Sequence, residues 1–345
     1  MKIKIACLLG LSILLQLRTA AGWDYEGHRA VNQLALASLP KNFPAFALTP
    51  EARERITFLA GEPDRWRNSD ELSLAQANGT DHYIDMEQLD DYGLTPQNLP
   101  AFRYDFAARL AVERATHSTK FAAIDPMKNR DHTRELMGFL PWAIVENEAK
   151  LRSCFSYLKA FQDHGGTPEE ISNAQQNILY IMGVMGHYVG DGSQPLHATK
   201  HHHGWVGNNP HGYSTNFSFH AWIDGGFFRK MGGIKVETLA GKVRPAKIVG
   251  DPLQQGDLFK QVMAYLLETE KEVEPLYQLE KEHKLTPENE KANEGQAFLD
   301  AQLVKGGQML GDLWFSAWQQ ATEDKYLIRT LNDRKAAAAA AAEKK

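Results

Sequence analysis

The sequence contains only two cysteines among its 345 residues. Cys7 lies in an N-terminal hydrophobic segment, so Cys154 is the single cysteine of the remainder and no internal disulfide bond can form there. Strands are also scarce, because few segments alternate polar and apolar residues; residues 233–243 are the best candidate for a short hairpin. The fold must therefore be stabilised by helix packing and, where ligands allow it, by metal.

A basic surface is lacking as well. The chain has 38 Lys and Arg against 43 Asp and Glu, with a formal net charge of −5. This balance excludes a protein that coats duplex nucleic acid by charge alone. We expect any anionic substrate to be held locally, and metal ions are the obvious means.

No hydrophobic run is long enough to span a bilayer. The start of the chain instead has the three parts of an export signal: basic Lys2 and Lys4, an apolar core at 5–17, and small residues at 20–22. Gln16 and Arg18 interrupt the run and argue against the alternative, an uncleaved membrane anchor. The sequence predicts a signal peptide over residues 1–22, a secreted or periplasmic protein that begins at Trp23, and no transmembrane segment after cleavage.

Apolar residues recur at helical spacing through most of the chain, which predicts a mainly α, single-domain multi-helix fold over residues 23–333 with little β structure. Segments 85–135 and 199–219 collect Pro, Gly, Asn and charge without a period and are expected to be irregular. Residues 275–295 are strongly charged and read as a helix end followed by a loop. Residues 334–345, with alanines at 336–342, are predicted to be a disordered tail because they have no apolar face to dock.

Two His/Asp pairs carry the chemistry. His187 and Asp191 are four residues apart, as are His220 and Asp224, and this spacing places both side chains on one helical face where they can bind the same ion. Gly192 and Pro195 end the first helix, so that His197 is free to turn toward a neighbouring ion. One such pair is common in helices by chance. Two pairs, His197 and the N-terminal His28 together predict metal binding.

Several motifs resemble the zinc-dependent superfamily of single-strand-specific nucleases and bacterial phospholipases C. The most specific block runs from His187 through Asp191 to His197 and reads His-Tyr-Val-Gly-Asp-Gly-Ser-Gln-Pro-Leu-His. The similarity spans nearly the whole mature chain. The other matching motifs are Trp23-(four residues)-His28, Asp64-Arg65-Trp66-Arg67, His82-Tyr83-Ile84-Asp85 and His220-(three residues)-Asp224.

This resemblance implies a helical fold with a trinuclear zinc site, three Zn²⁺ per chain, at the base of a cleft. By matching position, Asp191 would bridge two of the ions. The resemblance assigns Asp64, His82, His187 and Asp191 to one zinc, His197, His220 and Asp224 to a second, and the Trp23 amine and carbonyl with His28 and Asp191 to the third.

The implied assignments make physical sense. The amine and carbonyl of Trp23 can form a five-membered chelate, and an α-amine with a pKa of about 8 readily loses its proton to zinc. A water bridging two zinc ions provides a hydroxide nucleophile at neutral pH. Asp64 and Arg67 are the expected catalytic residues: Asp64 to orient or deprotonate that water, and Arg67 to meet the transition-state charge. A structural pairing of Arg67 with Asp85 or Asp64 is an equally open interpretation.

Other conspicuous residues have plainer interpretations. The run His201, His202 and His203 is expected to form a solvated rim or a substrate-facing loop, and Asp81 to point away from the site. Core packing is expected of Trp142, Trp314 and Trp318. Base stacking, if any, is expected from the loop between the ligands, at Trp205, Tyr213 or Phe217.

Three features favour the nuclease branch: the step from Trp23 to His28, the step from His197 to His220, and an aspartate at Asp224. The function expected is therefore an exported zinc-dependent phosphodiesterase that cleaves single-stranded DNA or RNA to 5′-phosphate products, with no obligate protein partner. The alternative is a zinc-dependent phospholipase C acting on phospholipid head groups. A third hypothesis is a non-catalytic, zinc-stabilised exported protein, which clustered ions with open positions disfavour.

Overall fold

The computed structural model describes residues 23–343. The predicted signal peptide, residues 1–22 with Cys7, lies outside the described residues, as do residues 344–345. Within the described range the protein is a single multi-helix domain without strands, which confirms the predicted mainly α fold.

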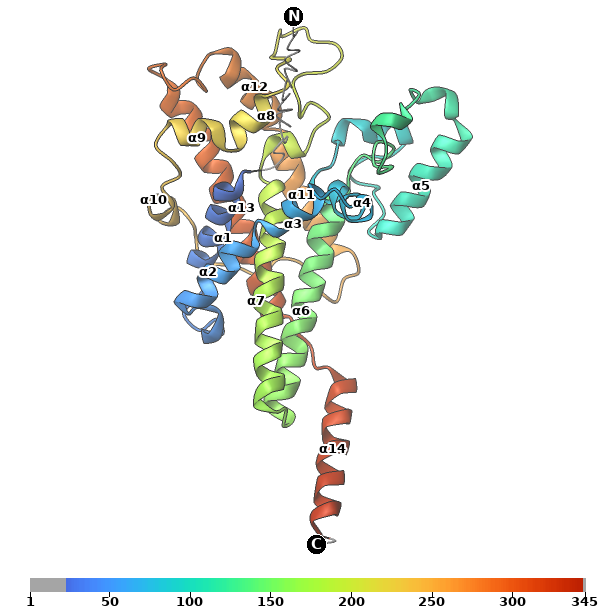
Figure 1. Cartoon of the computed structure of the whole chain (residues 1–345), viewed down its shortest axis with the longest axis vertical. Coiled ribbons are helices and arrows are strands. Elements are labelled where there is room, and N and C mark those ends of the chain that lie inside the picture. The colour runs from blue at the N-terminus through green and yellow to red at the C-terminus, as the bar shows by residue number, and fades with distance from the viewer. Residues whose placement is uncertain (1–22, 344–345) are drawn as a thin grey trace, which may run out of the picture.

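Two long antiparallel helices, α6 (Leu140–His164) and α7 (Pro168–Asp191), form the centre of the molecule (Figure 1). The start of α7 is fixed by a capping box. Thr167 Oγ1 accepts a hydrogen bond from the Glu170 amide at 3.2 Å, and the Glu170 carboxylate accepts one from the Thr167 amide at 2.8 Å. Pro168 occupies the first turn, where its missing N–H costs nothing. The end of α7 at Asp191, just before Gly192, agrees with the predicted helix stop.

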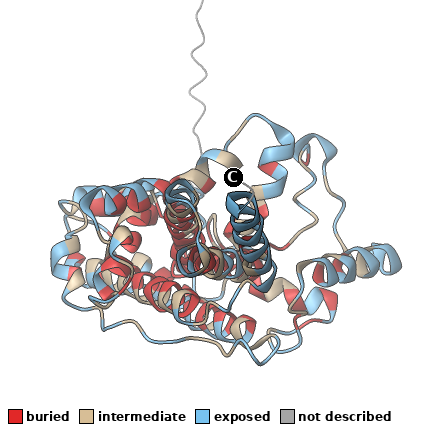
Figure 2. Ribbon diagram, turned by 90° about the horizontal axis from the view of Figure 1, so that it is seen from below, coloured by how far each residue is buried: buried red, intermediate tan, exposed pale blue. Residues whose placement is uncertain are grey.

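Helices α1 (Tyr25–Ser38) and α13 (Ala292–Gln319) pack along each other and against this central pair. α1 begins at Asp24, whose side chain accepts a hydrogen bond from the Gly27 amide at 3.1 Å. Buried residues line the inward faces of the central helices, whereas their outer faces are exposed (Figure 2). The predicted core tryptophans agree: Trp142 and Trp314 are buried, and Trp318 packs against the core.

Shorter helices complete the domain. They are α2 (Pro50–Leu59), α3 (Glu62–Arg67), α4 (Leu72–Gly79), α5 (Arg103–Thr116), α8 (Phe219–Ala221), α9 (Phe227–Lys230), α10 (Val236–Ala240), α11 (Asp257–Glu270) and α12 (Val273–Lys281). The loop between α12 and α13 confirms the expectation for residues 275–295. Residues 199–218 are irregular, also as expected.

Three local predictions are wrong. The proposed hairpin at 233–243 contains α10 instead, which buries Leu239 as a helical residue. Segment 85–135 is not irregular throughout, because α5 spans fourteen of its residues and buries Phe106 and Leu110. The tail is not disordered over its described part: α14 runs over Lys325–Glu343. Alanine has the highest helix propensity, so the alanines at 336–342 continue a helix even though they dock against nothing.

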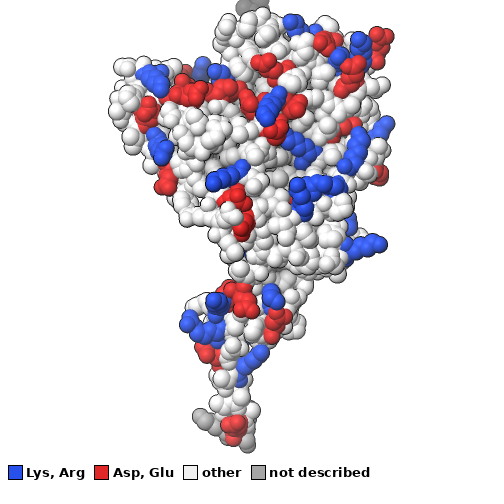
Figure 3. Space-filling model, turned by 180° about the vertical axis from the view of Figure 1, so that it is seen from behind, with Lys and Arg blue, Asp and Glu red and all other residues white. Residues whose placement is uncertain are grey.

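No helix in residues 23–343 is both long and apolar enough to cross a membrane. On the face shown in Figure 3, Lys and Arg side chains are interspersed with Asp and Glu, and neither sign covers the surface. On this face, any attraction of an anion must therefore come from a local arrangement of groups.

Candidate metal centre

The predicted metal ligands come from separate segments and meet at the C-terminal end of α7. His187 and Asp191 lie on the last turns of that helix. All of the predicted ligand side chains are buried except that of Asp64, which is partly buried. The others come from α1 (His28), α3 (Asp64), the 3₁₀ turns Thr80–His82 (His82) and Pro195–His197 (His197), and α8 with the turn that follows it (His220 and Asp224).

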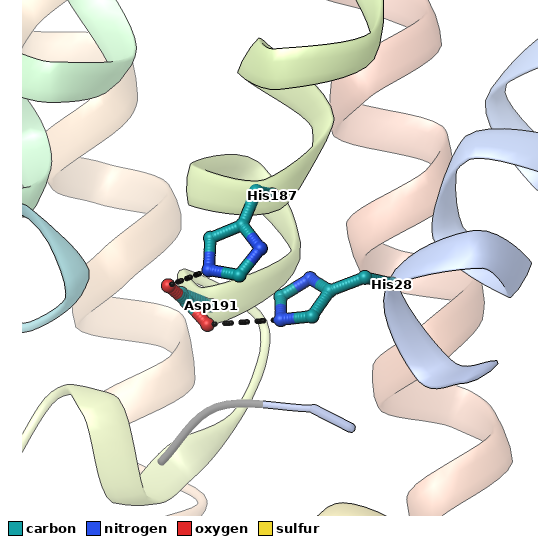
Figure 4. Close-up of side chains that lie close together, drawn as sticks. All are labelled: His28, His187 and Asp191. Atoms are coloured by element: carbon teal, nitrogen blue, oxygen red, sulfur yellow. Dashed lines mark ion pairs between the residues drawn. The ribbon is translucent and has the colours of Figure 1, made fainter. Parts of the chain in front are cut away.

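The first group consists of His28, His187 and Asp191 (Figure 4). Asp191 Oδ1 lies 3.5 Å from His28 Nε2, and Asp191 Oδ2 lies 3.3 Å from His187 Nε2. The two imidazole rings are stacked, with centroids 3.7 Å apart. This approach requires glycine at Gly190, because a Cβ there would lie 2.9 Å from His28 Nδ1.

The second group consists of Asp64, His82 and His187. His187 Nε2 lies 2.9 Å from His82 Nδ1 and 3.8 Å from Asp64 Oδ1. His82 Nδ1 also lies 3.0 Å from Asp191 Oδ2. Within each group the donor atoms lie within 4.8 Å of one another. His187 therefore belongs to both groups, and Asp191 contacts both.

The third predicted set, His197, His220 and Asp224, lies beside these two. His220 Nε2 is 3.5 Å from Asp224 Oδ1, although a π-helical turn, Trp222–Gly226, replaces the regular helix that the four-residue spacing predicted. The rings of His197 and His220 meet edge to face at 4.9 Å. His197 Nδ1 lies 3.6 Å from Asp191 Oδ1, which connects this set to the rest of the cluster.

Backbone and side-chain groups outside the cluster orient these ligands by hydrogen bonds. The Ala60 carbonyl lies 2.7 Å from His187 Nδ1, and the His82 carbonyl accepts a hydrogen bond from His197 Nδ1. Gln194 Nε2 donates to Asp224 Oδ1 at 2.7 Å. With Nδ1 engaged on a carbonyl, each of the two imidazoles has its Nε2 lone pair for a metal ion.

Trp23 lies directly against the cluster. Its side chain is fully buried, and its indole Nε1 donates to Ser193 Oγ at 3.2 Å. The next residue, Asp24, donates its amide hydrogen to the Asp224 carbonyl at 3.1 Å. The predicted new N-terminus is therefore placed next to a predicted ligand. Its role as a ligand through the free amine stays a prediction.

The donor set fits a metal. Among the described residues, several buried polar atoms of this cluster have no hydrogen-bond partner: His28 Nε2, His197 Nε2, Asp191 Oδ1 and Asp224 Oδ2. A buried polar atom without a partner costs about 1–3 kcal/mol. A cation between these imidazole and carboxylate atoms would remove that cost, and imidazole with carboxylate suits zinc as well as other transition-metal ions.

The protonation states also suit a cation. Burial lowers the pKa of four histidines below the ordinary imidazole value. For His187 burial is outweighed by the carboxylates of Asp191 and Asp64, which raise its pKa. Burial disfavours the charge of Asp191 too, yet His197 and His187 hold its pKa well below the usual range. The pKa values of His28 and His220 lie well below the ordinary imidazole value. The pKa of His82 is lowered to about 3, and that of His197 is lowered as well.

Asp224 differs from the other carboxylates of the cluster. Burial raises its pKa well above the usual range, although Gln194 donates a hydrogen bond to it. Burial therefore disfavours the ionised form of this carboxyl, and a dication bound beside it would favour that form.

A pocket of about 410 Å³ opens on the cluster. Cluster residues His197 and His220 form one part of its lining, next to Arg67. Arg67 Nη2 lies 3.0 Å from Asp64 Oδ1, so of the two pairings left open by the sequence this one is observed. The pocket is further lined by His202, His203, Tyr83, Asp85, Lys128 and Arg134.

The loop 199–219 distributes its aromatic residues differently from expectation. Trp205 stacks on His201 with centroids 3.9 Å apart, and Tyr213 is buried beside it, so both hold the loop together. Phe217 is 58 % exposed and its ring stacks on that of His203, which lines the pocket. Of the three stacking candidates, Phe217 is the one available to a substrate.

The histidine run divides in the same way. His202 and His203 line the pocket, as expected for a substrate-facing loop, whereas His201 is buried and accepts a hydrogen bond from the Val206 amide at 3.0 Å. Asp81 points away from the cluster, as expected, and pairs with Arg103.

Sequence reasoning missed the pocket wall formed by Lys128, Asp131 and Arg134. These residues lie in the aperiodic segment 85–135, where no spacing signals which side chains face the site. It also missed the Ala60 carbonyl, because a backbone group carries no sequence signature. The orienting role of Gln194 was detectable in principle, since Gln194 stands inside the Gln-Pro-Leu-His block.

The structure thus defines a buried His/Asp cluster that can hold a metal ion, next to an open pocket. In comparisons with protein-family models and with curated proteins, the chain matches none of them. The interpretation of the site therefore depends on its own geometry and chemistry.

Proposed function

We propose that the protein is an exported zinc-dependent phosphodiesterase that hydrolyses single-stranded nucleic acids to 5′-phosphate products. The observation that supports this proposal is that the candidate metal cluster and a pocket lined by cationic side chains lie next to each other. A buried cluster of imidazole and carboxylate donors, with unsatisfied lone pairs, adjoins a pocket lined by Arg67, Lys128 and Arg134. A metal-binding cluster beside these three cationic side chains, which outnumber the lining carboxylates Asp85 and Asp131, suits an anionic ester better than a neutral substrate.

Three donor sets that contact one shared carboxylate support a count of three zinc ions. Asp64, His82 and His187 with Asp191 would hold one ion, His28 and Asp191 with the Trp23 amine created by cleavage a second, and His197, His220 and Asp224 a third. Zinc bound there would supply Lewis acidity and hydroxide at neutral pH.

The residues of the chain have distinct tasks in the proposed reaction. Asp64 is the cluster carboxylate that reaches the solvent side, with its side chain 27 % exposed, so it is placed to accept a proton from an attacking water. Arg67 holds that carboxylate at 3.0 Å and lines the pocket, where its charge stabilises a phosphorane-like transition state. The four cluster histidines whose pKa values are lowered stay neutral and keep their lone pairs for the ions.

The rim of the pocket favours nucleic acid over lipid. Phe217 presents an exposed ring stacked on His203, with centroids 4.3 Å apart. Such an aromatic surface beside a phosphodiester site suits a splayed nucleobase, and base stacking on an aromatic ring contributes about 1–3 kcal/mol. The remaining lining is largely polar or charged, which offers little contact to acyl chains.

An open pocket also weighs against a purely structural role for the metal. Structural zinc sites are closed by protein ligands, whereas catalytic sites keep a position open to substrate. Here His197 and His220 belong both to the cluster and to the pocket lining. An ion held by them would face the pocket.

One set of assays tests the proposal. Protein exported with its own signal is purified, its zinc content is measured, and its rate is determined on single-stranded DNA, RNA and phosphatidylcholine vesicles. The expected result is nucleic-acid cleavage that leaves 5′-phosphate ends. Release of phosphocholine with no nucleic-acid cleavage at matched enzyme concentration would replace the proposal with the phospholipase C alternative, and activity on none of the three would favour the non-catalytic role.

A matched pair of variants links the activity to the site. Asp64→Asn should lower the rate by about 10²–10⁴, the usual contribution of a general base. Asp163→Asn removes an exposed carboxylate at the far end of α6, whose partner is Lys159, and should leave the rate unchanged. Equal rates for both variants would remove Asp64 from the mechanism.

A further inference from the structure

Residues 86–136, here called the arm, begin and end beside the predicted ligand His82. The chain leaves the site at Asp85, whose amide donates to the Met137 carbonyl at 2.8 Å, and the Phe139 amide donates to the Thr80 carbonyl at 2.7 Å. Gly138 makes this close return possible, with φ of 101°, because a Cβ there would lie 1.9 Å from the Tyr83 carbonyl oxygen. Both ends of the arm are thereby fixed to the segment that carries His82.

The body of the arm is anchored on α6. Trp142 Nε1 donates to the Pro100 carbonyl at 3.1 Å, and the rings of Phe106 and Trp142 stack with centroids 4.3 Å apart. Arg103 at the start of α5 binds the Glu146 carboxylate through two hydrogen bonds of 2.8 and 2.9 Å. The arm includes α5, which lies to one side of the central helices in Figure 1. These contacts make the arm part of the packed structure.

The last part of the arm is a loop built around buried Asn129. Its Nδ2 donates to Glu135 Oε1 at 2.7 Å, and its Oδ1 accepts a hydrogen bond from the Arg134 amide at 3.1 Å. Arg134 Nε donates to the Lys128 carbonyl at 2.7 Å. These bonds hold Lys128 and Arg134 next to each other, and both line the pocket together with His197 and His220.

The charges on this wall favour an anion. Asp131 and Asp85 also line the pocket. Asp131 Oδ1 accepts hydrogen bonds from the Thr133 amide and hydroxyl, and Asp85 Oδ2 accepts one from Gln88 Nε2 at 2.9 Å, so both carboxylates have donors of their own. The remaining donors of Arg134 form a planar fork, and Lys128 adds a mobile ammonium group; both geometries suit phosphate oxygens. Arg67, in contrast, is bound to Asp64 on the cluster side.

We propose that Lys128 and Arg134 form a subsite for a backbone phosphate adjacent to the one that is cleaved. This inference rests on the proposed nuclease function and narrows its substrate class to strands that carry more than one phosphate. A dinucleoside with a single phosphodiester reaches the cluster without filling this subsite, whereas an oligonucleotide fills both positions.

The test compares two substrates and three variants. The substrates are thymidylyl-thymidine, which has only the scissile phosphate, and a dye-labelled oligothymidylate of eight residues. Lys128→Gln and Arg134→Gln should each raise KM for the oligonucleotide by about tenfold, as expected when a charge-assisted hydrogen bond to phosphate is removed. KM for thymidylyl-thymidine and the zinc content should not change.

Arg130→Gln is the matched control. Arg130 lies on the same loop and is exposed, but it does not line the pocket. It should leave both KM values unchanged. A second readout is the dependence of oligonucleotide binding on salt, measured by fluorescence anisotropy: removing one cation that binds a phosphate lowers the slope of log Kd against log salt by about one, and only the two pocket variants should show this. Lys128→Gln leaves the carbonyl that binds Arg134 intact, so its effect cannot come from loss of the loop.

The outcomes separate this subsite from the activity itself. If the wild type cleaves the oligonucleotide and the pocket variants retain its KM, the subsite is rejected and the nuclease function stands. An equal rise in KM for both substrates would also reject it, because the residues would then bind the scissile phosphate. If the wild type binds the oligonucleotide without cleaving it and the variants lose this binding, the subsite stands and the activity is rejected. A wild type that neither binds nor cleaves it rejects both.

Discussion

Asp191 Oδ2 lies 3.0 Å from His82 Nδ1, although 109 residues separate them in the chain. The other oxygen, Oδ1, faces His28 Nε2 at 3.5 Å and His197 Nδ1 at 3.6 Å. One carboxylate thus contacts imidazoles from three segments, with its two oxygens directed to different donor groups. This is the arrangement expected of a carboxylate that bridges two ions.

Asp191→Asn should therefore remove metal from two positions. The amide keeps the size of the side chain but loses the charge and one acceptor, so both ions that it would bridge are weakened together. Elemental analysis after dialysis should give about three zinc ions in the wild type and about one in the variant, with loss of activity. A variant that loses a single ion and keeps its rate would contradict a bridging role.

The N-terminus gives a second prediction. Trp23 is buried against Ser193, and Asp24 is bonded to the Asp224 backbone, so the amine created by cleavage would appear at the cluster. Protein produced without the signal but with a retained initiator methionine should lose one zinc and most activity, because its Trp23 nitrogen is then an amide. Exported protein should begin at Trp23. Full activity of the methionine-extended form would exclude the amine as a ligand.

Glu148 on α6 gives a prediction for pH. It is 1 % exposed, its Oε2 has no hydrogen-bond partner among the described residues, and Arg152 Nη2 lies 3.8 Å from the carboxylate. Burial raises its pKa to about 7, and Arg152 only partly offsets this. Between the unfolded pKa of about 4.3 and pH 7, the unfolded chain loses this proton while the folded chain keeps it, so stability falls as pH rises.

Glu148→Gln should remove this dependence. At pH 8 the variant should be more stable than the wild type by about 1 kcal/mol, because a buried charge without a full partner is gone. Denaturant unfolding at pH 5 and pH 8 measures the difference. Glu169→Gln, an exposed site in the first turn of α7, is the control and should leave the difference between the two pH values unchanged. A wild-type stability equal at both pH values would contradict the raised pKa.

The C-terminal helix gives a prediction for truncation. In α14 only Leu331 is buried, and beyond it the ion pair between Arg334 and Glu170 is partly exposed. Removal of residues 336–345 should change the free energy of unfolding by less than about 0.5 kcal/mol, as is usual for exposed positions. Leu331→Ala should cost about 2 kcal/mol or more. A large loss on truncation would mean that the alanine segment docks.

The sequence predicted the parts of this molecule that follow a period. Helix α7 shows an apolar face up to Met185, and its final His187 and Asp191 stand four residues apart, so both the helix and the meeting of these two side chains were predictable. His28 on α1 meets His82 and His197, which lie on 3₁₀ turns, at Asp191. Residue spacing could not predict this meeting, because long-range packing determines it. For those ligands the resemblance supplied the assignment.

The errors have physical causes too. Helix α5 was missed because its apolar face is short, with only Phe106 and Leu110 buried among charged neighbours. Lys128 and Arg134 are held by Asn129 and by backbone carbonyls, and such bonds leave no pattern in a sequence. The helix through 336–342 reflects the high helix propensity of alanine, which acts without an apolar face to dock.

The last prediction separates nuclease from lipase at Phe217. A single strand can bring one phosphodiester to the cluster and place a neighbouring base on the ring of Phe217, whereas a stacked duplex must first unpair at a cost of a few kcal/mol. Hydrolysis of denatured DNA or RNA should therefore exceed that of duplex DNA by at least about tenfold, since each 1.4 kcal/mol is a factor of ten.

Phe217→Ala should raise KM for single strands with no change in zinc content or Tm. Trp205→Ala, in contrast, should lower Tm, because Trp205 is stacked on His201 inside the loop. If Phe217→Ala leaves KM unchanged, or if duplex and single strands are cleaved equally fast, bases do not stack on this ring and the preference for single strands needs another origin.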